Sequence, residues 1–344
     1  MDTQTRKKYL KWRRKKILKK IFFFLATVFI SYLIIHLVYE SGILRRDEPV
    51  MNIENYETTQ NIEDNAKNLV EKIKIYDSND EDVAIIFGPP INPCIGLDFT
   101  PIVDVMTLYG ATVAIHFENL ATGCTFYHRE EDRFFGASLM KAPFALWLYE
   151  QADFGFVDLS EELVFQPWNK LFGSGIIRHE YPIWTVFNIE RLIGLNLYES
   201  DNTATEMLQQ RFEFNDFAYF IRDLAGVPHF YGNVLYSYVN AREVGTFARS
   251  IFNYIESATP NAIKFKTHLL NNQFPFIQSD FPVASKTGWY HRFGGAWHDM
   301  AIIYAPSPFS LVLLSSHRTG EIADYEAFTS ITSAFEEFNR INFE

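Results

Sequence analysis

The stretch ASLMKAPFAL, residues 137–146, places two polar side chains, Ser138 and Lys141, among small and apolar residues. On a helix, residues three apart share a face, so the hydroxyl and the amine would be neighbours. The unpaired N–H groups and the dipole at a helix start stabilise negative charge, which suits an activated hydroxyl. Apolar surroundings would lower the pKa of Lys141, whose neutral amine could then take the serine proton. We therefore expect Ser138 to be a nucleophile and Lys141 its base.

The spacing S-x-x-K is weak evidence by itself, because it occurs by chance about once in a chain of this length. A helix-capping serine followed by a lysine that reaches solvent explains Ser138 and Lys141 without any catalysis. Two further triplets favour the catalytic interpretation of Ser138 and Lys141 over the capping interpretation. SDN at 200–202 enters a predicted helix, and KTG at 286–288 lies at the end of a predicted strand. The ordered trio is expected in about one of a few hundred unrelated chains.

Hydrophobic periodicity predicts strands at both ends of a domain that begins near Gly96. The early elements are a helix over 97–110 and a hairpin of two strands, 111–120 and 123–128. A long helix starts at Ala137, and a mostly helical middle extends to about residue 270. Three antiparallel strands and a closing helix follow, over 281–289, 298–305, 309–316 and 323–341. We expect an α/β (α+β) sandwich whose antiparallel sheet is built from both chain ends around a helical insert.

With these motifs in place, the chain from about residue 97 onward resembles the penicillin-recognising serine hydrolases, and among them the class A β-lactamase-like branch. The resemblance rests on S-x-x-K, SDN and KTG. It extends to HFENLATGCTFYHREEDRFFGASLMKAP (116–143), WTVFNIERLIGLNLYESDNTATEML (184–208) and GGAWHDMAIIYAP (294–306). It implies the class A β-lactamase/transpeptidase-like fold and an acyl-enzyme reaction on a peptidoglycan peptide or a β-lactam.

The resemblance also implies a role for each motif residue. Ser138 would be acylated with Lys141 as its base partner, and Ser200 would relay a proton to the leaving nitrogen. Lys286 and Thr287 would hold the substrate carboxylate and polarise Ser200. The other predicted substrate contacts are Asn202 through its amide, Gly288, and Trp289, whose backbone N–H would complete an oxyanion hole with that of Ser138.

Two motif positions need a separate remark. Asp201 is expected to be structural. Trp289 is bulkier than the small residue usual at its position in class A enzymes, so it would narrow the site or simply pack against its neighbours.

One departure from the family pattern concerns release of the acyl group. Class A β-lactamases place a water-activating glutamate between SDN and KTG, usually within E-x-x-L-N. No acid within 203–285 begins that pattern, and Glu243 lies at a predicted helix start, where a structural role is expected. Slow deacylation favours a serine acyl hydrolase or transferase acting on D-Ala-D-Ala-type peptides. The alternatives are a class A-like β-lactamase and a non-catalytic cell-wall-binding protein.

The N-terminal segment predicts a membrane anchor. Residues 1–20 hold ten Lys or Arg and one acid, and 21–39 form an apolar run without Asp, Glu, Lys or Arg. That length suits one bilayer crossing, with the basic side cytoplasmic. A cleaved signal peptide is the alternative, but its apolar region is normally shorter. We expect a single-pass cell-membrane protein with a cytoplasmic N-terminus, an extracytoplasmic stalk over 40–95 and an extracytoplasmic hydrolase domain over 96–344.

Composition narrows the remaining possibilities. The 344 residues are 48 % hydrophobic and include 33 Phe, enough for a large core. Beyond residue 20, acids outnumber Lys and Arg by 41 to 21, so no nucleic-acid partner is expected. The histidines form no metal-binding pattern and there is no phosphate-binding loop, so we predict no metal and no cofactor. Cys94 and Cys124 either form a disulfide in an oxidising space or remain two free thiols.

Overall fold

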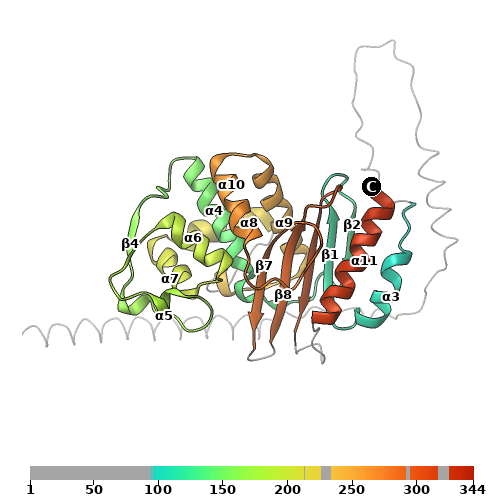
Figure 1. Cartoon of the computed structure of the whole chain (residues 1–344), viewed down its shortest axis with the longest axis horizontal. Coiled ribbons are helices and arrows are strands. Elements are labelled where there is room, and N and C mark those ends of the chain that lie inside the picture. Colours follow the sequence, from blue (N-terminus) through green and yellow to red (C-terminus); the bar gives the residue numbers. More distant parts are fainter. Residues whose placement is uncertain (1–93, 95, 213, 226–233, 292–294, 317–324) are drawn as a thin grey trace, which may run out of the picture. The chain divides into compact units, whose positions relative to one another are not determined.

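The computed structural model describes residues 94, 96–212, 214–225, 234–291, 295–316 and 325–344, whose arrangement is drawn in Figure 1. The predicted cytoplasmic segment (1–20), the predicted anchor (21–39) and nearly all of the predicted stalk (40–95) lie outside the described residues. Within the described residues, no helix has the length and apolar character that a bilayer crossing requires.

A five-stranded antiparallel sheet forms the centre of the fold, in the order β2-β1-β9-β8-β7. Two strands come from the start of the domain and three from its end: β1 (Val113–Asn119), β2 (Thr125–His128), β7 (Val283–Tyr290), β8 (Ala296–Ile303) and β9 (Phe309–Ser315). Ile115 of β1 pairs with Leu313 of β9, which joins the two groups. The prediction of an antiparallel sheet built from both chain ends is confirmed. Continuous apolar runs such as that of β9 form strands covered on both faces.

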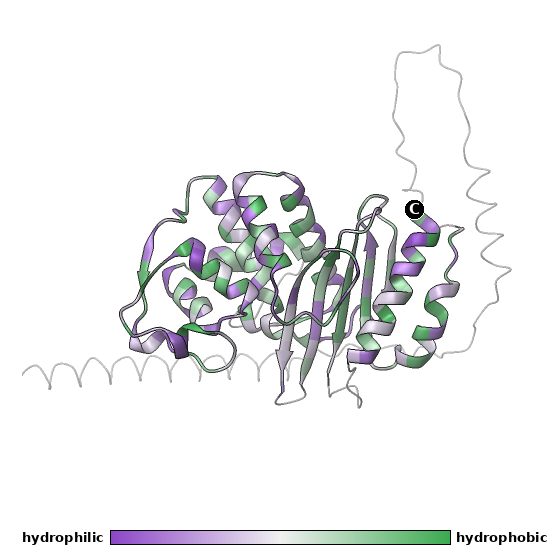
Figure 2. Ribbon diagram, viewed as in Figure 1, coloured by the Kyte–Doolittle hydropathy of each residue, from purple (hydrophilic) through white to green (hydrophobic). Residues whose placement is uncertain are grey.

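Two helices from opposite ends of the domain cover one face of the sheet, α3 (Thr100–Tyr109) and α11 (Tyr325–Phe343) (Figure 1). On this face Phe117 of β1 stacks on Phe335 of α11, with ring centroids 5.2 Å apart. Hydrophilic and hydrophobic bands alternate along α11, as expected of a helix with one buried side (Figure 2). The predicted first and last helices are therefore confirmed.

The helical insert covers the other face and confirms the predicted helical middle (Figure 1). Its helices are α4 (Lys141–Asp153), α5 (Ile177–Glu180), α6 (Ile189–Tyr198), α7 (Asn202–Arg211), α8 (Phe214–Ala225), α9 (Ala241–Glu256) and α10 (Pro260–Leu270). Three 3₁₀ turns accompany them: η1 (Ala137–Met140), η2 (Pro167–Asn169) and η3 (Val234–Tyr236). Two small strand pairs were not predicted, because two or three residues carry no periodicity: β3 (Phe134–Phe135) with β6 (Tyr238–Val239), and β4 (Glu162–Val164) with β5 (Val186–Asn188).

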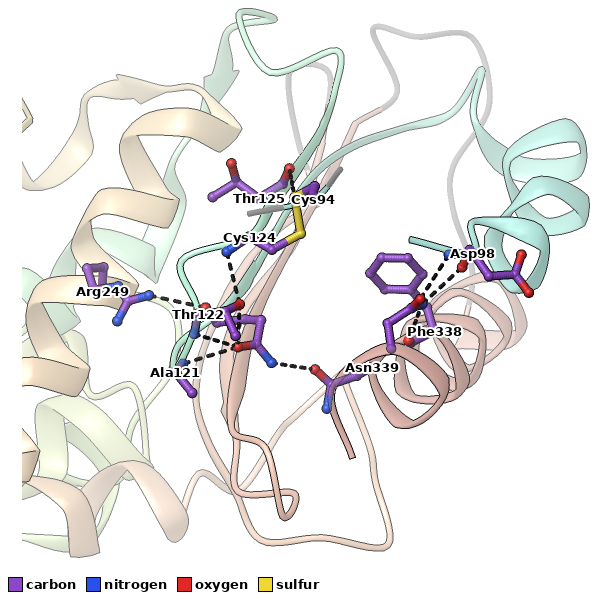
Figure 3. The surroundings of a disulfide bond; sticks show 11 residues. Cys94, Asp98, Ala121, Thr122, Cys124, Thr125, Arg249, Phe338 and Asn339 are labelled. Atoms are coloured by element: carbon purple, nitrogen blue, oxygen red, sulfur yellow. Dashed lines mark hydrogen bonds between the residues drawn. A yellow bond between two sulfur atoms is a disulfide. The ribbon is translucent and has the colours of Figure 1, made fainter. Parts of the chain in front are cut away.

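A disulfide ties the first described residue to the central sheet. Cys94 is bonded to Cys124, which immediately precedes β2 (Figure 3). The adjoining turn is fastened to α11, since Asn119 donates a hydrogen bond to Asn339 at 3.0 Å. Of the two alternatives left open by the sequence, the structure has the disulfide.

Candidate active site

Ser138 lies in the 3₁₀ turn η1, which leads directly into α4. The predicted long helix therefore begins with a tighter turn, and Lys141 is the first residue of α4 itself. Ala137, just before Ser138, has φ +46°, and Ser200 has φ +52°. Residues other than glycine rarely adopt this left-handed conformation, and such strain concentrates at functional sites. Two of the strained residues thus fall within or beside the predicted catalytic motifs.

The Lys141 side chain is buried and contacts three oxygens. Its Nζ lies 2.5 Å from the Ser200 carbonyl oxygen, 3.3 Å from Ser200 Oγ and 2.7 Å from Asn202 Oδ1. Burial, and then the nearby charge of Lys286, lowers the pKa of Lys141 well below its ordinary value, while Asp201 opposes this. A neutral amine that donates its two hydrogens to the carbonyl and amide oxygens keeps a lone pair for a hydroxyl proton.

The predicted pairing of Ser138 with Lys141 is not made in the structure. Among the described residues, the Ser138 hydroxyl forms no hydrogen bond, and the Lys141 amine lies against Ser200 instead. Catalytic hydrogen bonds often tighten only in the complex with substrate. The role of Lys141 as the base therefore stays a prediction, and its contact with Ser200 is what the structure adds.

Ser200 lies between two buried amines. Lys286 Nζ donates a hydrogen bond to Ser200 Oγ at 3.1 Å and another to the Thr287 carbonyl oxygen at 2.9 Å. Burial lowers the pKa of Lys286 to about 7, and the Asp299 carboxylate acts in the opposite direction. A hydroxyl held between two amines can receive a proton from one side and release its own on the other, which is the geometry a proton relay needs.

Gly288 allows β7 to lie against the turn that carries Ser138. A Cβ at this position would sit 2.8 Å from the Gly136 carbonyl oxygen and 2.9 Å from Leu139 Cγ, closer than real Cβ atoms come. The absence of a side chain at Gly288 leaves room for this approach, and its predicted contact with the substrate stays a prediction. The next residue, Trp289, is consequently beside the turn that carries Ser138, as the predicted oxyanion hole requires.

Asn202 and Asp201 are held by their neighbours. Both ends of the Asn202 amide are engaged, because Oδ1 accepts from Lys141 and Nδ2 donates to the Phe172 carbonyl oxygen at 2.8 Å. The Asp201 carboxylate caps α7 through Oδ1, and Oδ2 accepts from the backbone N–H groups of Ile176 and Ile177 at 2.7 and 2.8 Å. Asp201 has the expected structural contacts.

Thr287 is positioned by a loop that the sequence did not single out. Its hydroxyl donates to the Phe274 carbonyl oxygen at 2.7 Å and accepts from Asn272 Nδ2 at 3.1 Å. Thr287 also lines the cavity described next, although its hydroxyl is engaged in these two hydrogen bonds.

A cavity of about 440 Å³ brings the separate motifs together. It is lined by Ser138, Ser174, Gly175, Ile176, Glu199, Ser200, Asn272, Phe274, Phe276, Lys286, Thr287, Trp289, Trp297 and Tyr325. Four predicted side chains and Trp289 therefore share one space. Lys141, Asn202 and Gly288 are not among its lining residues, and Lys141 contacts the lining residue Ser200.

Glu199 is a cavity residue that the sequence reasoning missed, although it directly precedes SDN. Among the described residues that line the cavity, it is the only acid. Burial, and then the charges of Asp201 and Glu180, raises the pKa of its carboxyl, while Arg191 opposes this. The other missed residues, including Asn272 and the aromatic side chains, come from segments far apart in the sequence, so no local signal could identify them.

Two expectations concern residues outside the cavity. Glu243 forms a capping box with Asn240 at the start of α9 and an ion pair with Arg133 at 2.7 Å, which agrees with its expected structural role. Over the ranges that the structure describes, no group of His, Cys, Asp and Glu is arranged to hold a metal ion.

The fold and the convergence of the three motifs define a serine hydrolase of the penicillin-recognising type. The model of the beta-lactamase enzyme family matches residues 100–337, and the chain belongs to this family. A search of curated proteins gave no match.

Solved structures share the fold at low sequence identity. A β-lactamase from Sphaerobacter thermophilus DSM 20745 has a TM-score of 0.61 and 20 % identity, covering 71 % of this chain and 98 % of that one. PBP-A has a TM-score of 0.57 and 17 % identity, covering 69 % and 97 %. A PBP-A mutant described as an acyl-enzyme complex with penicillin G has a TM-score of 0.57 and 18 % identity, covering 68 % and 95 %.

Proposed function

We propose that this chain is a membrane-anchored, extracytoplasmic serine acyl hydrolase or transferase that acts on peptidoglycan peptides of the D-Ala-D-Ala type. The observation that carries the proposal is the meeting of Ser138, Ser200 and Lys286 in one cavity, with the buried Lys141 amine against Ser200. The location rests on the basic segment 1–20 and the apolar run that follows it.

Acylation uses these groups in sequence. Ser138 Oγ attacks the substrate carbonyl carbon and its proton passes to the neutral Lys141 amine, which has to approach Ser138 from its position against Ser200 when the substrate binds. The backbone N–H groups of Ser138 and Trp289 stabilise the oxyanion. As the C–N bond breaks, the Ser200 hydroxyl gives its proton to the leaving nitrogen and takes one from Lys141, whose amine lies 3.3 Å away. Lys141 is thereby returned to its neutral form.

Recognition of the substrate carboxylate falls to Lys286 and Thr287. Lys286 and Thr287 both line the cavity, although both are buried. A lysine ammonium, together with a hydroxyl that turns from the Phe274 carbonyl oxygen to the ligand, matches a terminal carboxylate, which both D-Ala-D-Ala peptides and penicillins carry.

Deacylation separates the two candidate activities. The sequence between SDN and KTG has no E-x-x-L-N glutamate, which favours a long-lived acyl-enzyme on Ser138. The alternative, a class A-like β-lactamase, is favoured by one observation: the Glu199 carboxyl lines the same cavity as Ser138 and has a raised pKa. A carboxyl in that setting could activate the deacylating water.

The test is intact-protein mass spectrometry of the full chain in detergent, incubated with penicillin G and sampled over time. A stable adduct that disappears in Ser138→Ala supports the peptidase-like proposal. Rapid loss of the drug without an adduct supports the β-lactamase, and Glu199→Gln should then make the adduct persist. If there is neither adduct nor drug loss, and a D-Ala-D-Ala peptide is also left intact, the enzymatic proposal is wrong and a wall-binding function is favoured.

A further inference from the structure

Four aromatic side chains form a connected wall along the catalytic cavity, and no proposed catalytic step uses their rings. We call Phe276, Trp289, Trp297 and Tyr325 the aromatic wall. Trp289 meets Trp297 edge to face at 6.3 Å, Trp297 stacks on Phe276 at 5.4 Å, and Phe276 meets Tyr325 edge to face at 5.3 Å, all between ring centroids. Ring pairs at such distances attract one another, so the wall is one preformed surface.

Part of this aromatic surface is open to solvent although it adjoins the catalytic groups, while Phe276 is only 6 % exposed. Trp289 is 48 % exposed and Tyr325 55 %, and Phe274 at the rim is 57 % exposed. All three line the cavity with Ser138 and Lys286. Apolar area left in water is unfavourable, and a concave aromatic surface with a few polar groups is the usual form of a ligand site.

Buried polar contacts hold the wall in place. Asp299 Oδ2 accepts hydrogen bonds from the backbone N–H groups of Phe276 at 2.7 Å and Ile277 at 2.9 Å. Asp299 is also the cross-strand partner of Thr287. The loop that carries Phe276 is therefore fixed relative to the strand that carries KTG, so little ordering would be needed when a ligand binds.

The wall begins beside the proposed carboxylate site. Thr287 and Trp289 are two residues apart on β7, so their side chains leave the same face of the strand about 7 Å apart. Trp297 is the direct cross-strand partner of Trp289 and extends that face. A substrate whose carboxylate is held by Lys286 and Thr287 would therefore place the adjoining side chain against the wall. This is also the part of the substrate that leaves after Ser200 protonates its nitrogen.

We propose that the aromatic wall binds a bulky apolar side chain, preferably an aromatic one, on the carboxylate-bearing residue released when Ser138 is acylated. This inference rests on the proposed function and sharpens its substrate class. The methyl group of D-Ala would cover little of a cavity of about 440 Å³, whereas a benzyl group could contact several rings. Acyl peptides ending in an aromatic D-residue should thus be better substrates than those ending in D-Ala.

The test uses three thioesters with the same N-benzoylglycyl acyl group and different leaving thiols. The thiols are mercaptoacetate, 2-mercaptopropionate and 2-mercapto-3-phenylpropionate, which carry hydrogen, methyl and benzyl beside the carboxylate. Thiol release by the full chain is followed with a chromogenic disulfide. We expect kcat/KM for the benzyl thioester to exceed that for the methyl thioester by at least about ten-fold. Equal values for the two would overturn the proposal.

Matched variants test whether the preference for the benzyl leaving group depends on the aromatic wall. Tyr325→Ala should lower the benzyl rate several-fold more than the methyl rate, so that the ratio of the two rates falls. Tyr219→Ala is the control, because Tyr219 on α8 is similarly exposed, at 57 %, and does not line the cavity. If Tyr325→Ala lowers both rates equally, the wall has no part in selecting the leaving group and the proposal fails.

A binding measurement keeps this inference distinct from the proposed chemistry. D-phenylalanine and D-alanine, as released leaving groups, are titrated into the full-length Ser138→Ala chain while tryptophan fluorescence is recorded. Tighter binding of D-phenylalanine, lost in Tyr325→Ala, supports the wall even if no thioester is hydrolysed. The wall is refuted if the two amino acids bind equally or not detectably and the thioesters are hydrolysed at rates that do not depend on the leaving group. The proposed function would be retained in that case.

Discussion

Replacing Gly288 by alanine tests whether the approach of β7 to the turn that carries Ser138 is needed for the proposed acylation. The added methyl group would lie 2.8 Å from the Gly136 carbonyl oxygen and 2.9 Å from Leu139 Cγ. Ordinary van der Waals contact begins near 3.4 Å, so the strand and the turn have to separate by roughly half an ångström. The backbone on one side is part of a five-stranded sheet, so we expect the turn with Ser138 to move.

The expected magnitude follows from this separation. Forcing a methyl group into a packed site costs about 1–3 kcal/mol of unfolding free energy. Moving one oxyanion-hole donor out of position costs about 10²–10³ in rate. Because the proposed hole uses the N–H groups of Ser138 and Trp289, which lie on the two separated segments, we expect acylation to slow by about 100-fold or more.

The assay is the rate of adduct formation with penicillin G by mass spectrometry, with stability measured by urea unfolding. Gly155→Ala is the control, because that glycine has φ +79° and open space around it and does not line the cavity. The control should lose stability through backbone strain and still be acylated at the normal rate. If Gly288→Ala is acylated as fast as the unaltered chain, the reasoning about the oxyanion hole is refuted.

Three further predictions concern buried groups. Lys141→Met keeps the length of the side chain but leaves the Ser200 carbonyl oxygen and Asn202 Oδ1 without their donor, so we expect some loss of stability. Adduct formation by the folded variant should slow at least about 100-fold; a rate within ten-fold of normal would exclude Lys141 as the base. Burial raises the pKa of Asp299 to about 7 from 3.8. The folded state therefore binds more protons than the unfolded state between those values, and this contribution to stability declines as the pH rises from about 4 to 7. Asp299→Asn should flatten that part of a melting-temperature profile, and an unchanged slope would assign it to other groups. Reducing the Cys94–Cys124 disulfide should lower the unfolding free energy by about 3 kcal/mol, measured by urea unfolding with and without reductant; unchanged stability would show that the bond constrains little.

The motifs and the main secondary structure could be read directly from the sequence. S-x-x-K, SDN and KTG are short local patterns, and strands such as β9 are continuous apolar runs whose burial needs no knowledge of their partners. The last helix is equally visible, because its apolar residues recur along one side. Local spacing determined these features, so the fold class and the residues Ser138, Ser200 and Lys286 were accessible before any tertiary contact was known.

Tertiary structure alone decided how those residues meet. The Lys141 amine contacts Ser200, which is 59 residues away, rather than Ser138 on the adjoining turn. The disulfide required Cys94 to lie beside β2. The aromatic wall required Phe276, from a loop, and Tyr325, from the last helix, to face the same cavity. Such contacts depend on the packing of distant segments, which no local spacing in the sequence encodes. They shape the cavity in which, under our proposals, an acyl substrate would bind.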